Sequence, residues 1–211
     1  MPGPLSGAGS GLRPRTPEAL ATDLVELVAG RPGLVRVLLD GHGAGELADA
    51  LVPHLAALGR APLRVRGEDF LRPAGERFEL GREDGEHFRT RWLDAAALER
   101  EVLLRSADGS YLPALLDAER DRSYRRAREP VPGGAVVLVD GLFLLGRGLP
   151  CELTVHVALS PSALRRRGVP AWQVPAFEEY DRLVRPGDDC DVLVRAEDPR
   201  RPAVLVRSTD S

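Results

Sequence analysis

The sequence lacks lysine altogether: each of the 29 basic residues in the 211-residue chain is an arginine. An ammonium side chain is therefore excluded from any site, and negative charge on a ligand has to be met by guanidinium groups. A bias towards arginine, alanine, glycine and proline is typical of a GC-rich genome. Its chemical consequence is the same whatever its origin.

Cysteine is scarce, and long apolar runs are missing. The two cysteines, Cys151 and Cys190, have neither metal-ligand nor redox spacing, which predicts reduced structural thiols in a cytoplasmic protein. No apolar run reaches the roughly 18 residues of a membrane span, so we expect no membrane partner. Proline, glycine and serine stand where a secretory signal would be apolar, and residues 1–15 are expected to form a disordered tail.

The balance of charged and apolar residues is that of one ordinary domain. The 32 acidic residues and 29 arginines give a formal net charge of −3, so we expect no nucleic-acid partner. An apolar content of 43% over this length supports a single core, which places one domain at residues 16–211. The sequence leaves a homo-oligomer open.

Predicted strands and helices alternate along the chain. Apolar runs predict strands at residues 35–39, 62–66, 135–139, 153–159, 192–194 and 203–206. Caps and helical spacing predict helices at 17–30, at 44–58 with a kink near Pro53, at 94–105, after Ser160 and at 175–183. Residues 71–93 and 106–132 are expected to be mainly irregular. This order predicts a three-layer α/β/α domain with a mostly parallel sheet.

A glycine-rich turn follows the first of these strands. Residues 35–48 have the pattern of a buried strand, a turn and a helix start, which in α/β domains presents backbone N–H groups to a phosphate. A small-molecule ligand with a phosphate group is the partner that this pattern favours. The candidate nucleotide-binding residues are Gly41, His42, Gly43, Ala44 and Gly45.

This turn departs from the pattern G-x-x-x-x-G-K-[ST] of phosphate-binding loops. Only three residues separate Gly41 from Gly45, Glu46 takes the place of the lysine, and Leu47 cannot ligate a metal. A carboxylate about 4 Å from a phosphate oxygen costs on the order of a few kcal/mol. Unless Glu46 points away, ATP binding is expected to be weak.

Further motifs follow the turn in order. They are Glu68-Asp69-Phe70 with Arg72-Pro73 and Arg77, the acids Asp117 and Asp121, the run Val137-Leu138-Val139-Asp140-Gly141 with the apolar residues 142–145, and the arginines at 165–167. With Leu39-Asp40-Gly41, this order resembles the uridine kinase and phosphoribulokinase-like branch of the P-loop kinases over residues 16–194. The resemblance implies a P-loop NTPase-like fold with a degenerate phosphate-binding loop.

The resemblance also implies an activity. Proteins of this branch phosphorylate a hydroxyl of a nucleoside or similar small molecule with ATP and Mg²⁺ as cofactors. Carried over, it implies a catalytic base at Glu68, where the family has aspartate, or at Asp69, and a magnesium-organising acid at Asp140. It implies lid arginines at Arg165 and Arg166. The implied substrate contacts are Arg72, Arg77 and Asp117.

Each assignment has a structural alternative. Glu68 and Asp69 also fit a solvated loop pair, and Asp140 fits an Asp-Gly turn. Gly168-Val169-Pro170 interrupts the lid, so its arginines also fit a solvated helix face. The other candidates are His42, as ligand contact or turn residue; Trp92 and Trp172, as base-stacking or packing residues; and His54, His87 and His156, which lack metal spacing, with His156 fitting an ordinary strand residue.

Three functions are compatible with these residues. The first is a uridine kinase-like phosphotransferase in which arginine replaces the missing lysine. The second is a pseudokinase-like protein that keeps the fold, binds nucleotide weakly or not at all and transfers nothing. The third is a partner-binding domain that uses the arginine-rich segment 72–91 as its surface.

Overall fold

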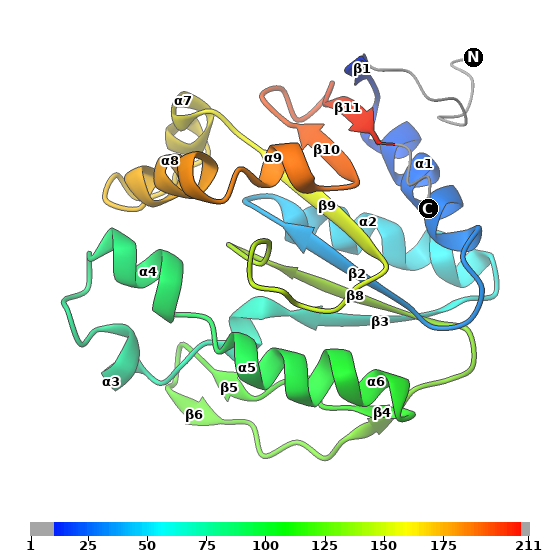
Figure 1. Cartoon of the computed structure of the whole chain (residues 1–211), viewed down its shortest axis with the longest axis horizontal. Helices are drawn as coiled ribbons and strands as arrows, with labels where there is room; N and C mark the ends of the chain where they lie inside the picture. The colour runs from blue at the N-terminus through cyan, green and yellow to red at the C-terminus, as the bar shows by residue number, and fades with distance from the viewer. Residues whose placement is uncertain (1–10, 208–211) are drawn as a thin grey trace.

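A seven-stranded sheet forms the centre of the molecule (Figure 1). The computed structural model describes residues 11–207. The strands are β1 (Arg13–Pro14), β2 (Val35–Asp40), β3 (Ala61–Arg66), β8 (Ala135–Gly141), β9 (Leu153–Ala158), β10 (Val192–Arg195) and β11 (Ala203–Val206). Their order is β1-β11-β10-β9-β2-β8-β3, in which the five strands from β10 to β3 are parallel and β11 is antiparallel to both its neighbours. The mostly parallel sheet predicted from the sequence is confirmed.

The two faces of the sheet support two separate cores. Along β2, Val37 belongs to one core and Leu38 to the other. Because both faces are covered, the strand is apolar at nearly every position, as the sequence pattern predicted. Helices α1 (Pro17–Ala29) and α2 (Ala44–Ala57) cover the first face, and the helical segment 95–107 covers the second. The arrangement is the three-layer α/β/α fold expected.

Side chains at the predicted caps begin three of the helices. Thr16, Asp94 and Ser160 accept hydrogen bonds from the N–H groups three residues on, at 3.2, 3.0 and 3.2 Å. Helix α2 continues past Pro53, and the kink expected there stays a prediction. Between residues 11 and 207, no helix combines the length and apolar character of a membrane span. The last helices are α7 (Pro161–Arg166), α8 (Val174–Leu183) and α9 (Pro186–Asp189).

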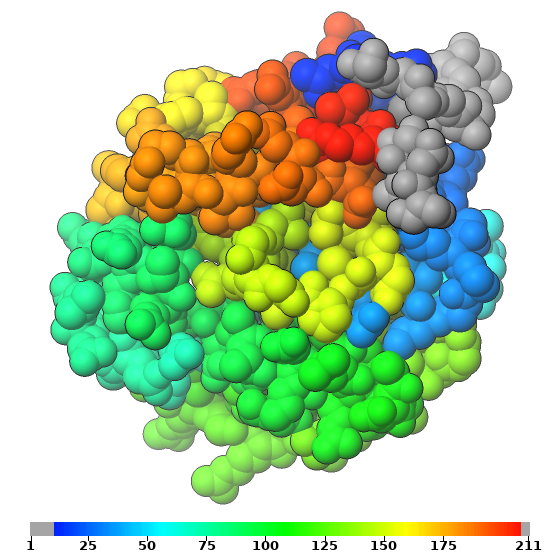
Figure 2. All heavy atoms as spheres, viewed as in Figure 1, coloured from blue at the N-terminus to red at the C-terminus, as the bar shows by residue number. Residues whose placement is uncertain are grey.

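The segment after β3 carries short elements. It begins with a 3₁₀ turn at Gly67–Phe70, α3 (Ala74–Arg77) and α4 (Gly85–Arg91). Figure 2 shows α4 beside α8. Phe88 of α4 packs edge-on against Trp172, which lies just before α8. The segment 95–107 then comprises α5 (Ala95–Leu98), a π-helical stretch at Glu99–Leu104 and α6 (Arg105–Ala107). Four two-residue strands follow: β4 (Ser110–Tyr111), β5 (Leu116–Asp117), β6 (Arg122–Ser123) and β7 (Glu129–Pro130).

The beginning of the described chain is part of the fold. Residues Arg13 and Pro14 pair with β11, and Arg15 forms a buried ion pair with Asp23 of α1 at 2.8 Å. The disordered tail expected for residues 1–15 is therefore wrong for this part, because a short antiparallel strand and a buried charge fix it. Residues 1–10 lie outside the described range.

Candidate functional site

A cavity of about 410 Å³ opens at the carboxyl ends of β2, β3 and β8. This is the edge of the sheet where the carboxyl ends of parallel strands bring loop residues together. The glycine turn, residues 41–45, forms one wall, and Phe88, Trp92 and Phe143 form an aromatic wall. The charged residues that line the cavity are Arg64, Arg66, Glu68, Arg89, Asp140 and Arg147.

The glycine turn is pressed against the neighbouring strands. Gly41 has φ +104° and donates its N–H to the carbonyl oxygen of Gly141 at 2.9 Å. A Cβ atom at this position would collide with the carbonyl oxygen of Val157 in β9. Only glycine therefore allows the turn to approach β9 this closely.

Backbone N–H groups at the start of α2 form hydrogen bonds with carbonyl groups of the glycine turn. The N–H of Ala44 bonds to Gly41 O at 3.2 Å, and that of Leu47 bonds to Gly43 O at 3.3 Å. The bond of Leu47 is the first i to i−4 bond of the helix, so of the four N–H groups that a helix start leaves free for an anion, that of Ala44 is engaged within the turn. Glu46 follows with an exposed side chain.

Arg64 of β3 occupies the space between the turn and β8. Its Nε donates to Oδ1 of Asp140 at 2.8 Å, and its Nη2 donates to the carbonyl oxygen of Gly45 at 3.1 Å. Its Nη1 also pairs with Asp49 of α2. Hydrogen bonding to Asp140 raises the pKa of Arg64, so this cation is permanent. One guanidinium therefore joins the edge strand β3, its neighbour β8 and helix α2, which follows the turn.

These contacts bear on the magnesium site that the resemblance implied at Asp140. Both carboxylate oxygens of Asp140 face Arg64, the second at 3.4 Å, and Leu47 offers no hydroxyl. Within residues 11–207, no group of three or more His, Cys, Asp and Glu side chains is arranged to hold a metal ion. The residues present do not fit a bound Mg²⁺.

Glu68 and Asp69, the two candidate bases, point to different places. Glu68 lines the cavity with an exposed side chain, 3.6 Å from the guanidinium of Arg66. Asp69 instead lines a second cavity of about 390 Å³ with Tyr124 and Arg126. Burial raises the pKa of Asp69, and the hydrogen bond from Tyr124 opposes that shift. The structure thus brings Glu68, and not its neighbour, to the cavity.

The three expected substrate contacts are engaged elsewhere. Arg72 pairs with Glu76 at 2.9 Å, and the buried Arg77 donates to the carbonyl oxygen of Ala118 at 3.0 Å. Asp117 accepts the N–H group of Arg120 at 3.0 Å, the main reason that its pKa is lowered. None of the three lines the cavity.

Of the lid arginines, the third one reaches the turn. Arg165 is exposed, and Arg166 lies 3.8 Å from Glu197, away from the loop. Arg167 instead places its Nη1 3.1 Å from where a Cβ of Gly43 would be, and its Nη2 donates to Ala196 O at 2.8 Å. Helix α7 ends at Arg166, so Arg167 turns towards the glycine turn while the side chains of Arg165 and Arg166 are exposed.

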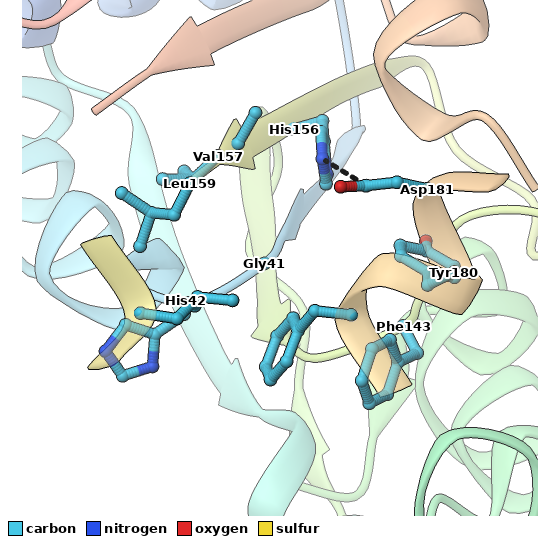
Figure 3. A pocket seen from close by; sticks show the side chains of 11 residues that line it. Gly41, His42, Phe143, His156, Val157, Leu159, Tyr180 and Asp181 are labelled. Carbon is cyan, nitrogen blue, oxygen red and sulfur yellow. Dashed lines mark ion pairs between the residues drawn. The ribbon is translucent and has the colours of Figure 1, made fainter. Parts of the chain in front are cut away.

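Asp40, the last residue of β2, belongs to the motif Leu39-Asp40-Gly41, but the sequence assigned it no role in the site. Its fully buried carboxylate accepts hydrogen bonds from Leu144 N at 2.8 Å, His156 Nδ1 at 2.7 Å and the Tyr180 hydroxyl at 2.9 Å. Burial and Asp40 raise the pKa of Tyr180. The second nitrogen of the His156 ring, Nε2, points to Asp181 at 4.0 Å, as Figure 3 shows. His156 is a residue of strand β9, as the sequence indicated, and its ring also holds the carboxylate that precedes the turn.

His42 and Trp92 line the cavity, whereas Trp172 does not. His42 lines the cavity and also the small pocket of Figure 3. Burial and the nearby Arg167 lower the pKa of His42, which favours the neutral form of the imidazole. Trp92 and Trp172 pack with Phe88, and only Trp92 also faces the cavity.

Comparisons with known proteins support the fold. No family model matches the sequence, and no curated protein matches it. A solved structure described as a possible uridine kinase from Bacillus stearothermophilus superposes with a TM-score of 0.68 at 18% identity, over 82% of this chain and 96% of that one. The structure of the YGR205w protein superposes with a TM-score of 0.57 at 11% identity, over 93% and 100%. At these identities the likeness shows that the chain shares the α/β fold of these structures and no more.

Proposed function

We propose that this domain is a kinase-fold protein that binds a small hydroxylated molecule in the cavity and does not transfer phosphate from Mg·ATP. The observation that carries the proposal is the position of Arg64. Its guanidinium holds Asp140, Asp49 and the carbonyl oxygen of Gly45 together. A magnesium ion at Asp140 would have to displace a cation that satisfies three acceptors.

The glycine turn supports the same proposal. The N–H group of Ala44 is already bonded within the turn, and the carboxylate of Glu46 repels the phosphates that the other N–H groups could bind. Phosphoryl transfer depends mainly on positioned cations around the phosphates. A lysine and a hydroxyl ligand are missing from the turn, and Asp140 is occupied by Arg64, whereas the cavity itself has the volume of a small-molecule site.

The second candidate is a uridine kinase-like phosphotransferase that acts on a hydroxyl of a nucleoside or similar molecule, with ATP and Mg²⁺. Glu68 favours it, because its carboxylate lines the cavity at the end of β3, where a base can orient an attacking hydroxyl. Arg167 beside Gly43 would then supply the missing positive charge. In either case we expect a cytoplasmic protein with a small-molecule partner and no nucleic-acid partner.

Calorimetric titration separates the two candidates. We expect no binding of Mg·ATP at millimolar concentration, no phosphoryl transfer, and binding of at least one member of a nucleoside and polyol panel without ATP. Tight Mg·ATP binding with turnover would overturn the proposal. Failure of both ATP and the panel to bind would favour a partner-binding domain.

The role given to Arg64 has its own matched test. Arg64→Gln removes the cation that occupies Asp140, so this variant should bind Mg·ATP more tightly than the original protein. Arg66→Gln changes an exposed arginine on the same strand and should give no such gain. Equal behaviour of the two variants would show that Arg64 does not block the metal.

A further inference from the structure

The cavity contains two arginines without a carboxylate partner. Arg64 is paired with Asp140, and Arg66 lies 3.6 Å from Glu68. No carboxylate oxygen in the described chain lies within 4.0 Å of Arg89 or Arg147. The carboxylates that line the cavity thus pair with Arg64 and Arg66, and Glu179 acts on Arg89 only from beyond 4.0 Å.

Arg147 is held in place by the backbone. Its Nε donates to Phe143 O at 2.6 Å, and its two Nη atoms donate to Thr90 O at 3.4 Å and Arg89 O at 2.7 Å. Burial is the main reason that the pKa of Arg147 is lowered. The charge of Asp40 raises the pKa of Arg147 from further away, but the oxygens of that carboxylate already accept hydrogen bonds from Leu144 and His156. A fixed, partly buried cation without a counterion favours a ligand that brings one.

Two neighbouring donors also lack an acceptor. Arg89 Nε and Trp92 Nε1 are buried and have no hydrogen-bond partner within residues 11–207. Both residues line the cavity, next to Phe88 and Phe143. Buried donors are almost always satisfied in folded proteins, so an oxygen-rich ligand at this end would complete their hydrogen bonding.

We propose that Arg89 and Arg147 form an oxyanion subsite, and that the cavity binds a small aromatic compound that carries a carboxylate or a phosphomonoester. The anion would lie between the two guanidinium groups, whose planar donors suit both oxyanions. The ring would pack on Phe88, Trp92 and Phe143. No metal takes part. This inference rests on the proposed small-molecule cavity and names the class of its ligand.

Calorimetric titration with three probes in EDTA tests the charge requirement. Phenyl phosphate, benzoate and benzyl alcohol share a ring and differ in the attached group. We expect at least one anionic probe to bind at least tenfold more tightly than benzyl alcohol, and the tighter anion identifies the phosphomonoester or the carboxylate as the better fit. No preference for either anion over the alcohol overturns the inference.

Variants test the location. Arg89→Gln removes a guanidinium whose Nε has no acceptor, and Arg147→Gln removes the one held by three carbonyl groups. Each should weaken anion binding at least tenfold and leave benzyl alcohol within twofold. Arg91→Gln, on the exposed side of the same helix, should change neither. If Arg147→Gln does not fold, Arg89→Gln carries the test alone.

Two further outcomes separate this inference from the proposed function. Loss of anion binding in Arg64→Gln, with Arg89→Gln unaffected, would place the anion at the glycine turn and overturn the inference. Phosphoryl transfer from Mg·ATP, measured separately, would overturn the proposed function. A protein that transfers phosphate and still needs Arg89 for phenyl phosphate would keep the oxyanion subsite.

Discussion

The Nε atom of Arg64 lies 2.8 Å from Oδ1 of Asp140, and the pair joins the edge strand β3 to its neighbour β8 at the mouth of the cavity. The side chains are 17% and 11% exposed, so solvent screens their attraction only partly. The resemblance implied that Asp140 helps to bind a metal, whereas in the structure Asp140 forms an ion pair with Arg64. Its strength is therefore the first quantity to measure.

Arg64→Gln should destabilise the fold. It leaves Asp140 without its cation and Gly45 O without its donor, and hydrogen bonds to charged groups contribute about 1.5–3 kcal/mol each. Urea denaturation should show a loss of that order in the free energy of unfolding. Arg66→Gln, at a side chain that is 54% exposed, should stay within about 0.5 kcal/mol. Equal losses in both variants would show that the pair with Asp140 adds nothing.

The buried carboxylate of Asp40 should show strong coupling to Tyr180. The Tyr180 hydroxyl donates to Asp40 at 2.9 Å, and His156 donates to the same oxygen at 2.7 Å. In a double-mutant cycle with Asp40→Asn and Tyr180→Phe, we expect an interaction energy of about 0.5–3 kcal/mol, as for residues that share one network. Additive losses would mean that the two side chains act independently.

Local patterns were sufficient to predict the sheet. Strands buried on both faces need apolar residues at most positions, so β2 and β8 stand out as near-continuous apolar runs. The short strand β1 has no such signal, since its two residues, Arg13 and Pro14, depend on pairing with β11 almost two hundred positions along the chain. Pairing over that distance leaves no periodicity in the segment itself.

The site was less predictable, because its contacts join distant residues. Arg64 and Asp140 are 76 positions apart, and Asp40 and His156 are 116 apart. Glu68 and the glycine turn could be placed because they directly follow strands that end at the same edge of the sheet. Two features of the sequence pointed to the remaining contacts. Because the chain has no lysine, a cation near the glycine turn has to be an arginine, and Arg64 is one. Because Asp40 ends a buried strand, its carboxylate needs hydrogen-bond donors.

Gly41→Ala should destabilise the protein strongly. The residue has φ +104°, and the added Cβ would collide with Val157 O. Strain of this backbone region alone costs of order 1–3 kcal/mol, and the collision adds to it. Gly75→Ala is the control, because nothing lies near its Cβ position in α3. Equal effects in thermal unfolding would show that the turn can move away from β9.

Alkaline titration should show two tyrosines that keep their protons above the ordinary tyrosine pKa. Burial raises the pKa of Tyr111 to about 12 and also raises that of Tyr180. The unfolded chain loses its phenolic protons at about pH 10, while the folded chain keeps those of Tyr111 and Tyr180. Stability is therefore full below about pH 10 and falls as the pH rises above it. A phenolate absorbance step near pH 10 that accounts for more than one of the three tyrosines of the folded protein would contradict this.

Glu46→Lys should increase stabilisation by ATP. The substitution replaces a carboxylate near the glycine turn with a cation, and a tenfold gain in affinity corresponds to about 1.4 kcal/mol. The rise in melting temperature at fixed ATP should be largest for Glu46→Lys, intermediate for Glu46→Gln and smallest for the original protein. If all three proteins respond equally, the charge of Glu46 is not what weakens the site. The engaged N–H group of Ala44, together with Arg64, would then be the cause, because charge alone cannot restore a short loop.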